Sequence, residues 1–138
     1  MIRHFCKSKI HRATVTGADL HYVGSITLST DLMRAADLMP YEKVQVVDID
    51  NGARLETYVI PSPHGESGDV CLNGAAARLI NTGDLVIIMS YCMLDEKELE
   101  EFKPRVVFVD QNNRILQVND EEIGFTTHLE LIRESCNS

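Results

Sequence analysis

The residues with the clearest chemical potential in this sequence are Gly24 and Ser25, which follow the run His21-Tyr22-Val23. Glycine accepts strained or left-handed backbone conformations, so a glycine-serine bond in a tight turn can be bent toward attack by the serine hydroxyl. Attack on the Gly24 carbonyl would convert the peptide link to an ester. Elimination of the ester and hydrolysis of the dehydroalanine left at position 25 would then give a pyruvoyl group. The pair therefore predicts self-cleavage, although glycine-serine is also a common turn dipeptide.

The same serine permits a second interpretation, a hydrolase. Ser25, His11 and Asp19 are the residue types of a nucleophile, a general base and an orienting acid. No nucleophile-elbow pattern surrounds Ser25, which argues against hydrolysis by such a triad.

Lys9 could instead act as a Schiff-base amine, which requires an uncharged lysine. His11 and His21 have no carboxylate or third histidine at ligand spacing, and we expect no metal.

Short strands must position these residues. Alternating residue types over residues 9–16 predict a strand with Lys9, His11, Ala13 and Val15 on one face, opposite Ile10, Arg12, Thr14 and Thr16. Further strands are predicted over residues 20–23, 26–28, 43–50, 54–60, 85–90, 106–109 and 114–118.

Turn and cap signals separate the predicted strands. Asp50-Asn51-Gly52 predicts a hairpin, Thr30-Asp31 begins a short helix over residues 30–38, and Asp95 with Glu98 forms a capping box. Residues 71–80 predict an apolar segment, a turn and one or two helical turns, whose first N–H groups suit an anion. Many short strands with brief helices indicate a mainly β chain that forms a mixed barrel.

The composition indicates one cytosolic domain. The 138 residues are 44% hydrophobic, which suits a single small core. The longest apolar run, residues 85–89, is too short to span a bilayer, and no signal-like segment opens the chain. The four cysteines form no C-x-x-C pair, so neither a zinc site nor a disulfide framework is indicated.

The net charge of −8 lies in two acidic segments. Residues 95–101 and residues 119–138 each hold five acids and one basic side chain, whereas residues 1–58 hold seven of each sign. Because no basic stripe is present, nucleic-acid binding is not expected. The region around Ser25 has no excess of negative charge that would repel a small anion.

Several stretches together closely resemble the aspartate 1-decarboxylase family, the pyruvoyl enzymes that make β-alanine for pantothenate. The stretches follow the family's order within residues 1–118. No single motif decides the resemblance, but their joint spacing is highly specific. The matching stretches are KIHRA at residues 9–13, ADLHYVGS at 18–25, NGAR at 51–54 with TY at 57–58, NGAAA at 73–77 and TGDLVII at 82–88.

The resemblance implies a fold, a substrate and partners. The fold would be a double-psi β barrel over residues 1–118, followed by an acidic and apolar C-terminal extension over residues 119–138. Cleavage would give chains of residues 1–24 and 25–138. The enzyme would act on L-aspartate in the cytoplasm as a homotetramer with active sites between protomers, and would need no metal, pyridoxal phosphate, nucleic acid or membrane. The sequence leaves open whether an accessory maturation factor assists cleavage.

The resemblance also implies roles for individual residues. Ser25 is the self-processing nucleophile and the precursor of the pyruvoyl group, and Thr57 supports processing near the Gly24 carbonyl together with His11. Tyr58 is the proton donor. The substrate-binding residues it implies are Lys9, Arg54, Thr57, Gly74, Ala75 and Ala76, the first two for carboxylates and the last three through their backbone.

Two departures from the family and one rival function accompany this interpretation. Val47 stands where some members carry a large aromatic side chain, and residues 119–138 fall outside the resemblance. That segment is apolar enough to pack on the barrel or a neighbouring subunit, with disorder as the alternative.

The rival function is that of a catalytically inactive barrel used for assembly or small-anion binding. Such a protein would have no need of Ser25, Thr57 and Tyr58 as a set.

Overall fold

The computed structural model describes residues 1–120 and residue 134, and this part of the chain is mainly β. Among the described residues, no helix is long and apolar enough to cross a membrane. The predicted C-terminal extension lies almost entirely outside the described residues. The strands are β1 Arg3–Thr14, β2 Gly17–Asp19, β3 Ser25–Leu28, β4 Lys43–Asp48, β5 Arg54–Pro61, β6 Val70–Asn73, β7 Leu85–Leu94, β8 Arg105–Val109 and β9 Ile115–Asn119, and the helices are α1 Thr30–Ala35, the 3-10 helix η1 Gly74–Arg78 and α2 Glu96–Leu99.

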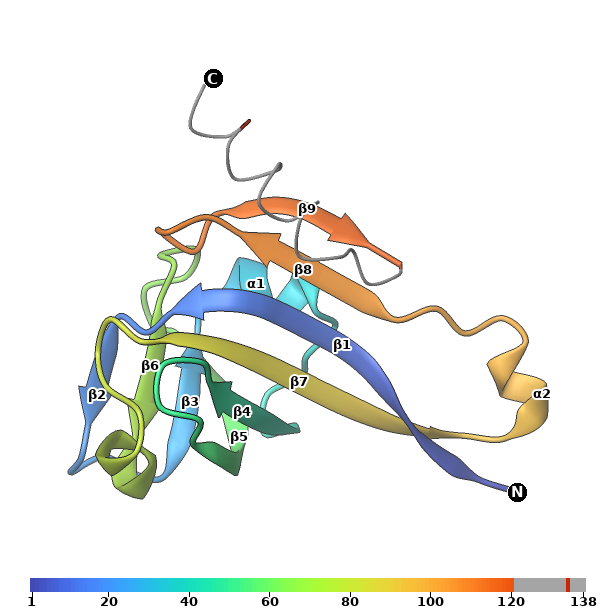
Figure 1. Cartoon of the computed structure of the whole chain (residues 1–138), viewed down its shortest axis with the longest axis horizontal. Coiled ribbons are helices and arrows are strands. Elements are labelled where there is room, and N and C mark those ends of the chain that lie inside the picture. Colours follow the sequence, from blue (N-terminus) through green and yellow to red (C-terminus); the bar gives the residue numbers. More distant parts are fainter. Residues whose placement is uncertain (121–133, 135–138) are drawn as a thin grey trace.

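The strands form one mixed sheet in the order β2-β6-β3-β5-β4-β7-β1-β8-β9. The long strands β1 and β7 lie side by side, with α2 near one end and β2, β3 and β6 gathered at the other (Figure 1). Only Val15 and Thr16 separate β1 from β2 in the chain, yet β2 is at one end of the strand order and β1 is near the other. The sheet must therefore curve back on itself, as a barrel does.

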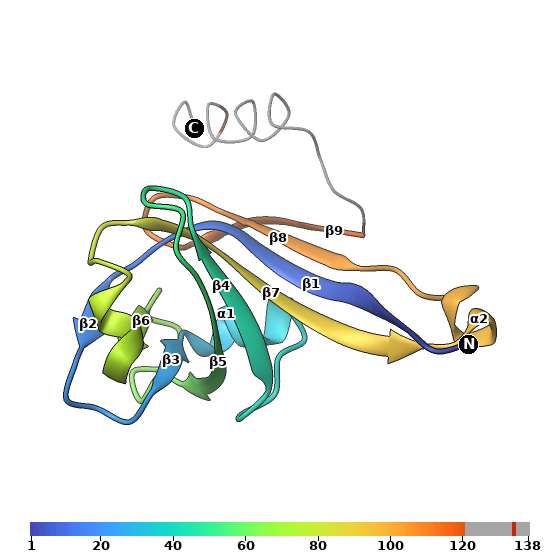
Figure 2. The ribbon, with the colours of Figure 1, turned by 60° about the horizontal axis from the view of Figure 1, so that its bottom comes forward.

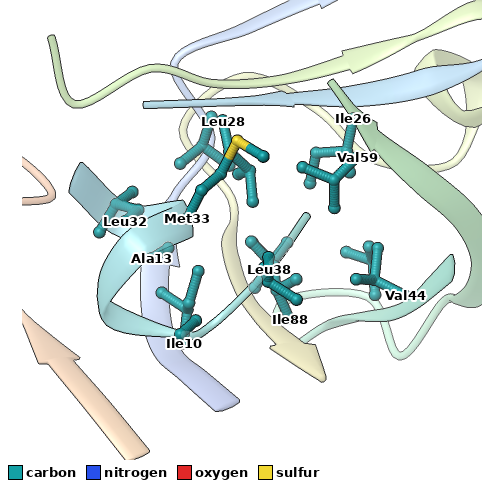
Figure 3. Packing of buried hydrophobic residues seen from close by; sticks show 14 of the residues in the cluster. Ile10, Ala13, Ile26, Leu28, Leu32, Met33, Leu38, Val44, Val59 and Ile88 are labelled. Atoms are coloured by element: carbon teal, nitrogen blue, oxygen red, sulfur yellow. The ribbon is translucent and has the colours of Figure 1, made fainter. Parts of the chain in front are cut away.

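The core fills the inside of this curved sheet. Helix α1 lies within the curve of the sheet (Figure 2), and buried side chains from β1, β3, β4, β5 and β7 meet its apolar face (Figure 3). Each large side chain of this kind contributes about 1.5–3 kcal/mol when it is fully buried. The cluster includes Ile10, Ala13, Ile26, Leu28, Leu32, Met33, Leu38, Val44, Val59 and Ile88.

The predicted alternation along the first strand is wrong after Ile10. Ile10 pairs with Ile88 but Ala13 pairs with Val86, so β1 contains one extra residue at this point. Arg12, which lies within this register shift, has a left-handed backbone, φ 61°. Beyond this β-bulge the side chains of β1 point to the opposite faces of the sheet from those that simple alternation predicts, which is why Ile10 and Ala13 are both buried.

The strand predicted over residues 20–23 is not formed. The Asp19 carboxylate oxygen Oδ1 accepts a hydrogen bond from His21 N at 3.1 Å, and the Asp19 carbonyl accepts one from Tyr22 N at 3.4 Å. These bonds turn the chain immediately after β2. The residues before the predicted cleavage site therefore lie on an exposed turn, with Tyr22 52% and Val23 69% exposed.

Helix α1 is shorter than predicted, and its cap differs. Its N-cap residue is Ser29 rather than Thr30, and the helix ends at Ala35 instead of residue 38. Asp37 has a φ of 53°, and Leu38 N donates to Met33 O at 2.8 Å, as at a left-handed helix C-terminus. That termination turns Leu38 into the core.

Other local predictions are confirmed. Strands β4 and β5 pair as an antiparallel hairpin across the predicted turn, and β8 and β9 do the same. Asp95 and Glu98 form the predicted capping box of α2. The predicted strands at residues 26–28 and 85–90 are also present, the second extended to Leu94.

Candidate active site

Ser25 is the first residue of β3 and lies at the border between the exposed turn and the buried sheet. Its side chain is 1% exposed. The hydroxyl donates to the Val23 carbonyl at 3.0 Å and accepts from Asn73 Nδ2 at 3.0 Å. One hydroxyl is therefore fixed by two partners next to a peptide bond that reaches the surface.

Asn73 is held in one orientation by three neighbours. It is the last residue of β6, pairs with Ser25 across the antiparallel β3–β6 ladder and is 3% exposed. Its Nδ2 also donates to Thr27 Oγ1 at 2.9 Å, and its Oδ1 accepts from the Cys71 thiol at 3.4 Å. Burial raises the pKa of Cys71, and Asp19 and Asp69 raise it further, so the thiol keeps the proton that it donates.

Gly74 brings the start of η1 against Gly24, at the predicted cleavage site. Its φ is +70°, and a β carbon at this position would lie 2.8 Å from Gly24 Cα and 2.9 Å from Gly24 N. Gly24 itself has no positive φ, and a β carbon there would meet nothing within 4 Å. Of the two conformations that the sequence allowed for Gly24, strained or left-handed, the left-handed one is not adopted, and the glycine that the geometry requires is Gly74.

Strand β5 places Thr57 and Tyr58 beside the predicted cleavage site. Strands β3 and β5 are parallel, with Ile26 opposite Val59. Continued by two residues, this register sets Tyr58 beside Ser25 and Thr57 beside Gly24. The Tyr58 ring also packs at 5.9 Å from the ring of Tyr41.

A cavity of about 410 Å³ joins these residues. The structure therefore brings together most of the predicted processing and catalytic residues within one chain, on the side of Gly24 that faces β5 and η1. The residues that line the cavity are Gly24, Leu55, Glu56, Thr57, Tyr58, Asn73, Ala75, Ala76 and Leu79.

A second cavity, of about 590 Å³, also has Asn73 in its lining. Its lining includes Thr27, Cys71 and His64, but also the carboxylates of Asp19 and Asp69. Two fixed carboxylates disfavour an anionic substrate. The first cavity holds one acid, Glu56, and that acid is paired with Lys43 at 3.1 Å.

Lys9 and His11 do not line the cavity beside Gly24. Both lie on β1, where Lys9 pairs with Met89 and Val106, and His11 pairs with Phe108. The His11 ring packs edge-on against the Phe108 ring at 5.7 Å. In the strand order, β5, β4 and β7 separate β1 from β3.

Arg54 and Val47 face each other at the hairpin formed by β4 and β5. Arg54 is exposed, and its Nη1 donates to Gln45 Oε1 at 2.9 Å. The Tyr91 hydroxyl donates to the same oxygen at 2.9 Å. Arg54 is thus positioned on the sheet surface, outside the lining of the cavity.

The hydrolase arrangement is not assembled. The Ser25 hydroxyl donates to Val23 O, and the Asp19 carboxylate accepts from the His21 backbone rather than orienting an imidazole. Asn73, which donates to the Ser25 hydroxyl and lines the cavity, is a residue to which the sequence interpretation assigned no role. Its position directly before Gly74 in a matching stretch was the available signal.

Comparison with known proteins gives one consistent result. A family model described as aspartate decarboxylase matches residues 1–116. The aspartate 1-decarboxylase of Moorella thermoacetica is 58% identical over 122 residues, which cover 88% of this chain and 94% of the relative. The enzymes of the same name from Acetivibrio thermocellus and Clostridium kluyveri are 62% and 60% identical, each over 116 residues that cover 84% of this chain and 91% of the relative.

Proposed function

This chain belongs to the aspartate decarboxylase family, and we propose on that basis that it converts L-aspartate to β-alanine and carbon dioxide for pantothenate biosynthesis. Its cofactor is a pyruvoyl group derived from Ser25. The observation that carries the proposal is the placement of the Gly24–Ser25 bond beside a cavity that Asn73, Thr57 and Tyr58 share with Gly24. A catalytically inactive barrel would have no need of these residues around a Gly-Ser bond.

Self-processing begins with the Ser25 hydroxyl. Its oxygen attacks the Gly24 carbonyl carbon, the bond to the Ser25 nitrogen breaks, and an ester links the two residues. Loss of the Ser25 α proton eliminates the ester, which leaves a carboxylate on Gly24 and a dehydroalanine at position 25. Water then releases ammonia from that residue. Thr57 is suited to stabilise the oxyanion, because it lines the same cavity as Gly24.

The surroundings of Ser25 fit the processing step and the group that it leaves. Asn73 Nδ2 lies 3.0 Å from Ser25 Oγ and so orients the oxygen that attacks Gly24 and departs with it when the ester is eliminated. The β3–β6 ladder holds the rest of residue 25 in place after cleavage, and the small side chains of Ala75 and Ala76 leave room in front of it. A pyruvoyl group supplies a carbonyl for the substrate amine and a sink for the electrons released with carbon dioxide.

The chain's own side chains decide which carboxylate leaves and where the proton goes. Only a bond aligned with the electron sink breaks easily, so binding of the side-chain carboxylate by Arg54 selects the α-carboxylate for loss. Lys9 provides a second positive charge for the substrate. Tyr58 donates the proton to the product carbon, from a ring that lines the cavity next to Gly24.

Assembly as a cytoplasmic homotetramer accounts for the residues that lie apart in one chain. Lys9 and His11 are on β1, away from the lining of the cavity, so a neighbouring protomer would have to bring them to it. Two inactive variants, Lys9→Ala and Tyr58→Phe, test this arrangement. Mixed tetramers should regain activity if the two residues come from different chains, and should stay inactive if both come from one.

Intact mass spectrometry of the purified protein tests the function itself. We expect two species, residues 1–24 and residues 25–138, the larger one lighter by one ammonia than a chain that begins with serine. Prolonged warm incubation should convert any remaining precursor. The Ser25→Ala variant should stay uncleaved and inactive. A cleaved or active Ser25→Ala protein would contradict the proposal.

A further inference from the structure

The Asn73 amide has different partners at its two ends. Its Nδ2 donates to the hydroxyl of Ser25 at 3.0 Å and to that of Thr27 at 2.9 Å, whereas its Oδ1 accepts from the Cys71 thiol at 3.4 Å. Cys71 and Asn73 are two residues apart on β6, so their side chains lie on the same face of the strand. The three side chains therefore form a chain of contacts that runs from Cys71 through Asn73 to Ser25.

The thiol is the partner that distinguishes the two ends of this amide. A hydroxyl can donate or accept, so Ser25 and Thr27 could each bind either the nitrogen or the oxygen of Asn73. A thiol donates weakly and is a poor acceptor for an amide N–H group. Cys71 therefore favours the orientation in which Oδ1 faces the thiol, and this orientation leaves Nδ2 for Ser25.

The orientation of the amide decides where the Ser25 proton points. In the structure Ser25 accepts from Asn73 and directs its own proton to the Val23 carbonyl at 3.0 Å. If the amide were reversed, the Ser25 hydroxyl would have to donate to Asn73 Oδ1 instead. The hydrogen bond to Val23 would then be lost, and the oxygen that attacks Gly24 would be held differently.

The neighbouring strands fix the position of the thiol. Cys71 pairs with Thr27 on β3 and with Gly17 on β2, the two strands that flank β6 (Figure 1). The backbone of Gly17 passes beside the sulfur, since a β carbon added there would lie 3.4 Å from Cys71 Sγ. The thiol is thus packed against one strand while it donates to Asn73.

The surroundings of Cys71 also keep its proton in place. Burial raises the pKa of the thiol, and the negative charges of Asp19 and Asp69 raise it further. Both aspartates line the second cavity together with Cys71. At neutral pH the sulfur is therefore a donor, which is the state that the contact with Asn73 Oδ1 requires.

We propose that Cys71 is a positioning residue for self-cleavage, because its thiol sets the orientation in which Asn73 presents Nδ2 to the Ser25 hydroxyl. The inference rests on the proposed function, since the step it concerns is the attack of Ser25 on Gly24. Cys71 is not among the residues that line the cavity beside Gly24, so it acts through Asn73. Loss of one hydrogen bond of this kind should change the cleavage rate by about 3- to 10-fold.

The variants Cys71→Ala and Cys71→Ser test this role. Newly purified precursor is incubated warm, and the loss of full-length mass is followed over time. We expect Cys71→Ala to cleave about 3- to 10-fold more slowly, and Cys71→Ser, which supplies an O–H donor, to recover most of the rate. A packing role predicts the opposite order, because serine places a more polar group than alanine in a half-buried position. Circular dichroism and melting temperatures confirm that both variants are folded.

Cys92→Ala is the matched control. Cys92 is another half-buried thiol whose pKa is raised by burial, but it lies on β7, which β4 and β5 separate from β3. This variant should cleave as the unmodified chain does. Cys71→Ala introduced into an Asn73→Ala chain should cause no further loss, because the thiol has no amide left to orient.

The side-chain amide of Asn73 gives a readout that does not depend on cleavage. Its signal in the NMR spectrum of the precursor is assigned by its disappearance in Asn73→Ala. In Cys71→Ala this signal should shift and its protons should exchange faster with water. In Cys71→Ser it should stay close to its position in the unmodified chain.

Three results would overturn the role of Cys71 while the proposed function stands. The unmodified chain cleaves but Cys71→Ala cleaves at the same rate, Cys71→Ser cleaves more slowly than Cys71→Ala, or the Asn73 signal is the same in Cys71→Ala as in the unmodified chain. If the unmodified chain itself stays full length after prolonged incubation, the proposed function is wrong and the role of Cys71 in cleavage is wrong with it.

Discussion

Gly74 lies so close to Gly24 that a β carbon at position 74 would stand 2.8 Å from Gly24 Cα. The two glycines are far apart in sequence, and the contact forms because β6 pairs with β3 directly before η1 begins. It holds the first turn of η1 against the residue whose carbonyl we propose is attacked. The geometry of the Gly24–Ser25 bond therefore depends on a residue outside the bond.

Gly74→Ala should impair cleavage. The substitution introduces a backbone clash with Gly24 and a left-handed conformation that costs alanine about 1–2 kcal/mol. We expect slower cleavage by mass spectrometry and a lower melting temperature. Gly65→Ala is the control, because Gly65 also has a positive φ, +67°, but a β carbon there meets nothing within 4 Å. Equal cleavage rates in the two variants would show that the contact with Gly24 is unimportant.

Asn73→Ala should slow cleavage about 5- to 150-fold, which corresponds to the roughly 1–3 kcal/mol lost when a buried polar group loses its partner. The reason is that Asn73 Nδ2 holds the Ser25 hydroxyl at 3.0 Å. Thr27→Val removes the other acceptor of the same amide and leaves Ser25 in place. We expect Thr27→Val to cleave at a rate within a few-fold of the unmodified chain. The rates are measured as loss of full-length mass over time.

Tyr58→Phe should separate processing from turnover. The variant keeps the ring beside Tyr41 but has no proton to give to the product carbon. We expect a normally cleaved protein whose kcat for β-alanine formation falls at least 100-fold. Tyr41→Phe keeps the same ring contact and should retain activity. A fully active Tyr58→Phe protein would remove Tyr58 from the reaction.

Arg54→Ala should cleave normally and bind aspartate poorly. The charge-assisted hydrogen bonds of a guanidinium to a carboxylate contribute about 1.5–3 kcal/mol, so KM should rise by about 10-fold or more. Arg34→Ala is the control, because Arg34 is exposed and pairs with Glu66 at 2.6 Å away from the cavity. The KM for aspartate of both variants is measured by steady-state kinetics. An unchanged KM in Arg54→Ala would exclude Arg54 from substrate binding.

The stability of the fold should fall in acid in a way that depends on Ser62. The Ser62 hydroxyl donates to Asp69 Oδ2 at 2.6 Å and lowers the pKa of Asp69, with smaller contributions from Ser67 and His64. The pKa of Asp69 in the folded protein therefore lies below its value of about 3.9 in the unfolded chain. The ionised Asp69 stabilises the fold at every pH above about 3.9, and this contribution is lost as the pH falls through the pKa of the folded state. Ser62→Ala should lower the melting temperature at pH 7 more than at pH 3. Equal losses at both pH values would contradict this role.

Local sequence signals predicted the elements whose chemistry is contained within a few residues. The turn at Asp50-Asn51-Gly52 and the capping box of Asp95 and Glu98 depend on side chains and backbone groups that are close in the chain. The spacing of the matching stretches was also sufficient to predict the family. The strand proposed over residues 20–23 failed because the Asp19 side chain captured the backbone of His21, a local bond that residue alternation does not report.

The sequence by itself determined the family and the strand that begins at Ser25, because these follow from residue types at fixed spacing. Only the tertiary structure decided that Asn73 holds Ser25, 48 residues away, that Gly74 rather than Gly24 carries the left-handed backbone, and that a bulge at Arg12 reverses the faces of β1. These relationships arise when the sheet curves back on itself and sets the registers of β3, β5 and β6. Register is fixed by burial across the whole barrel, and no short segment of the chain contains that information.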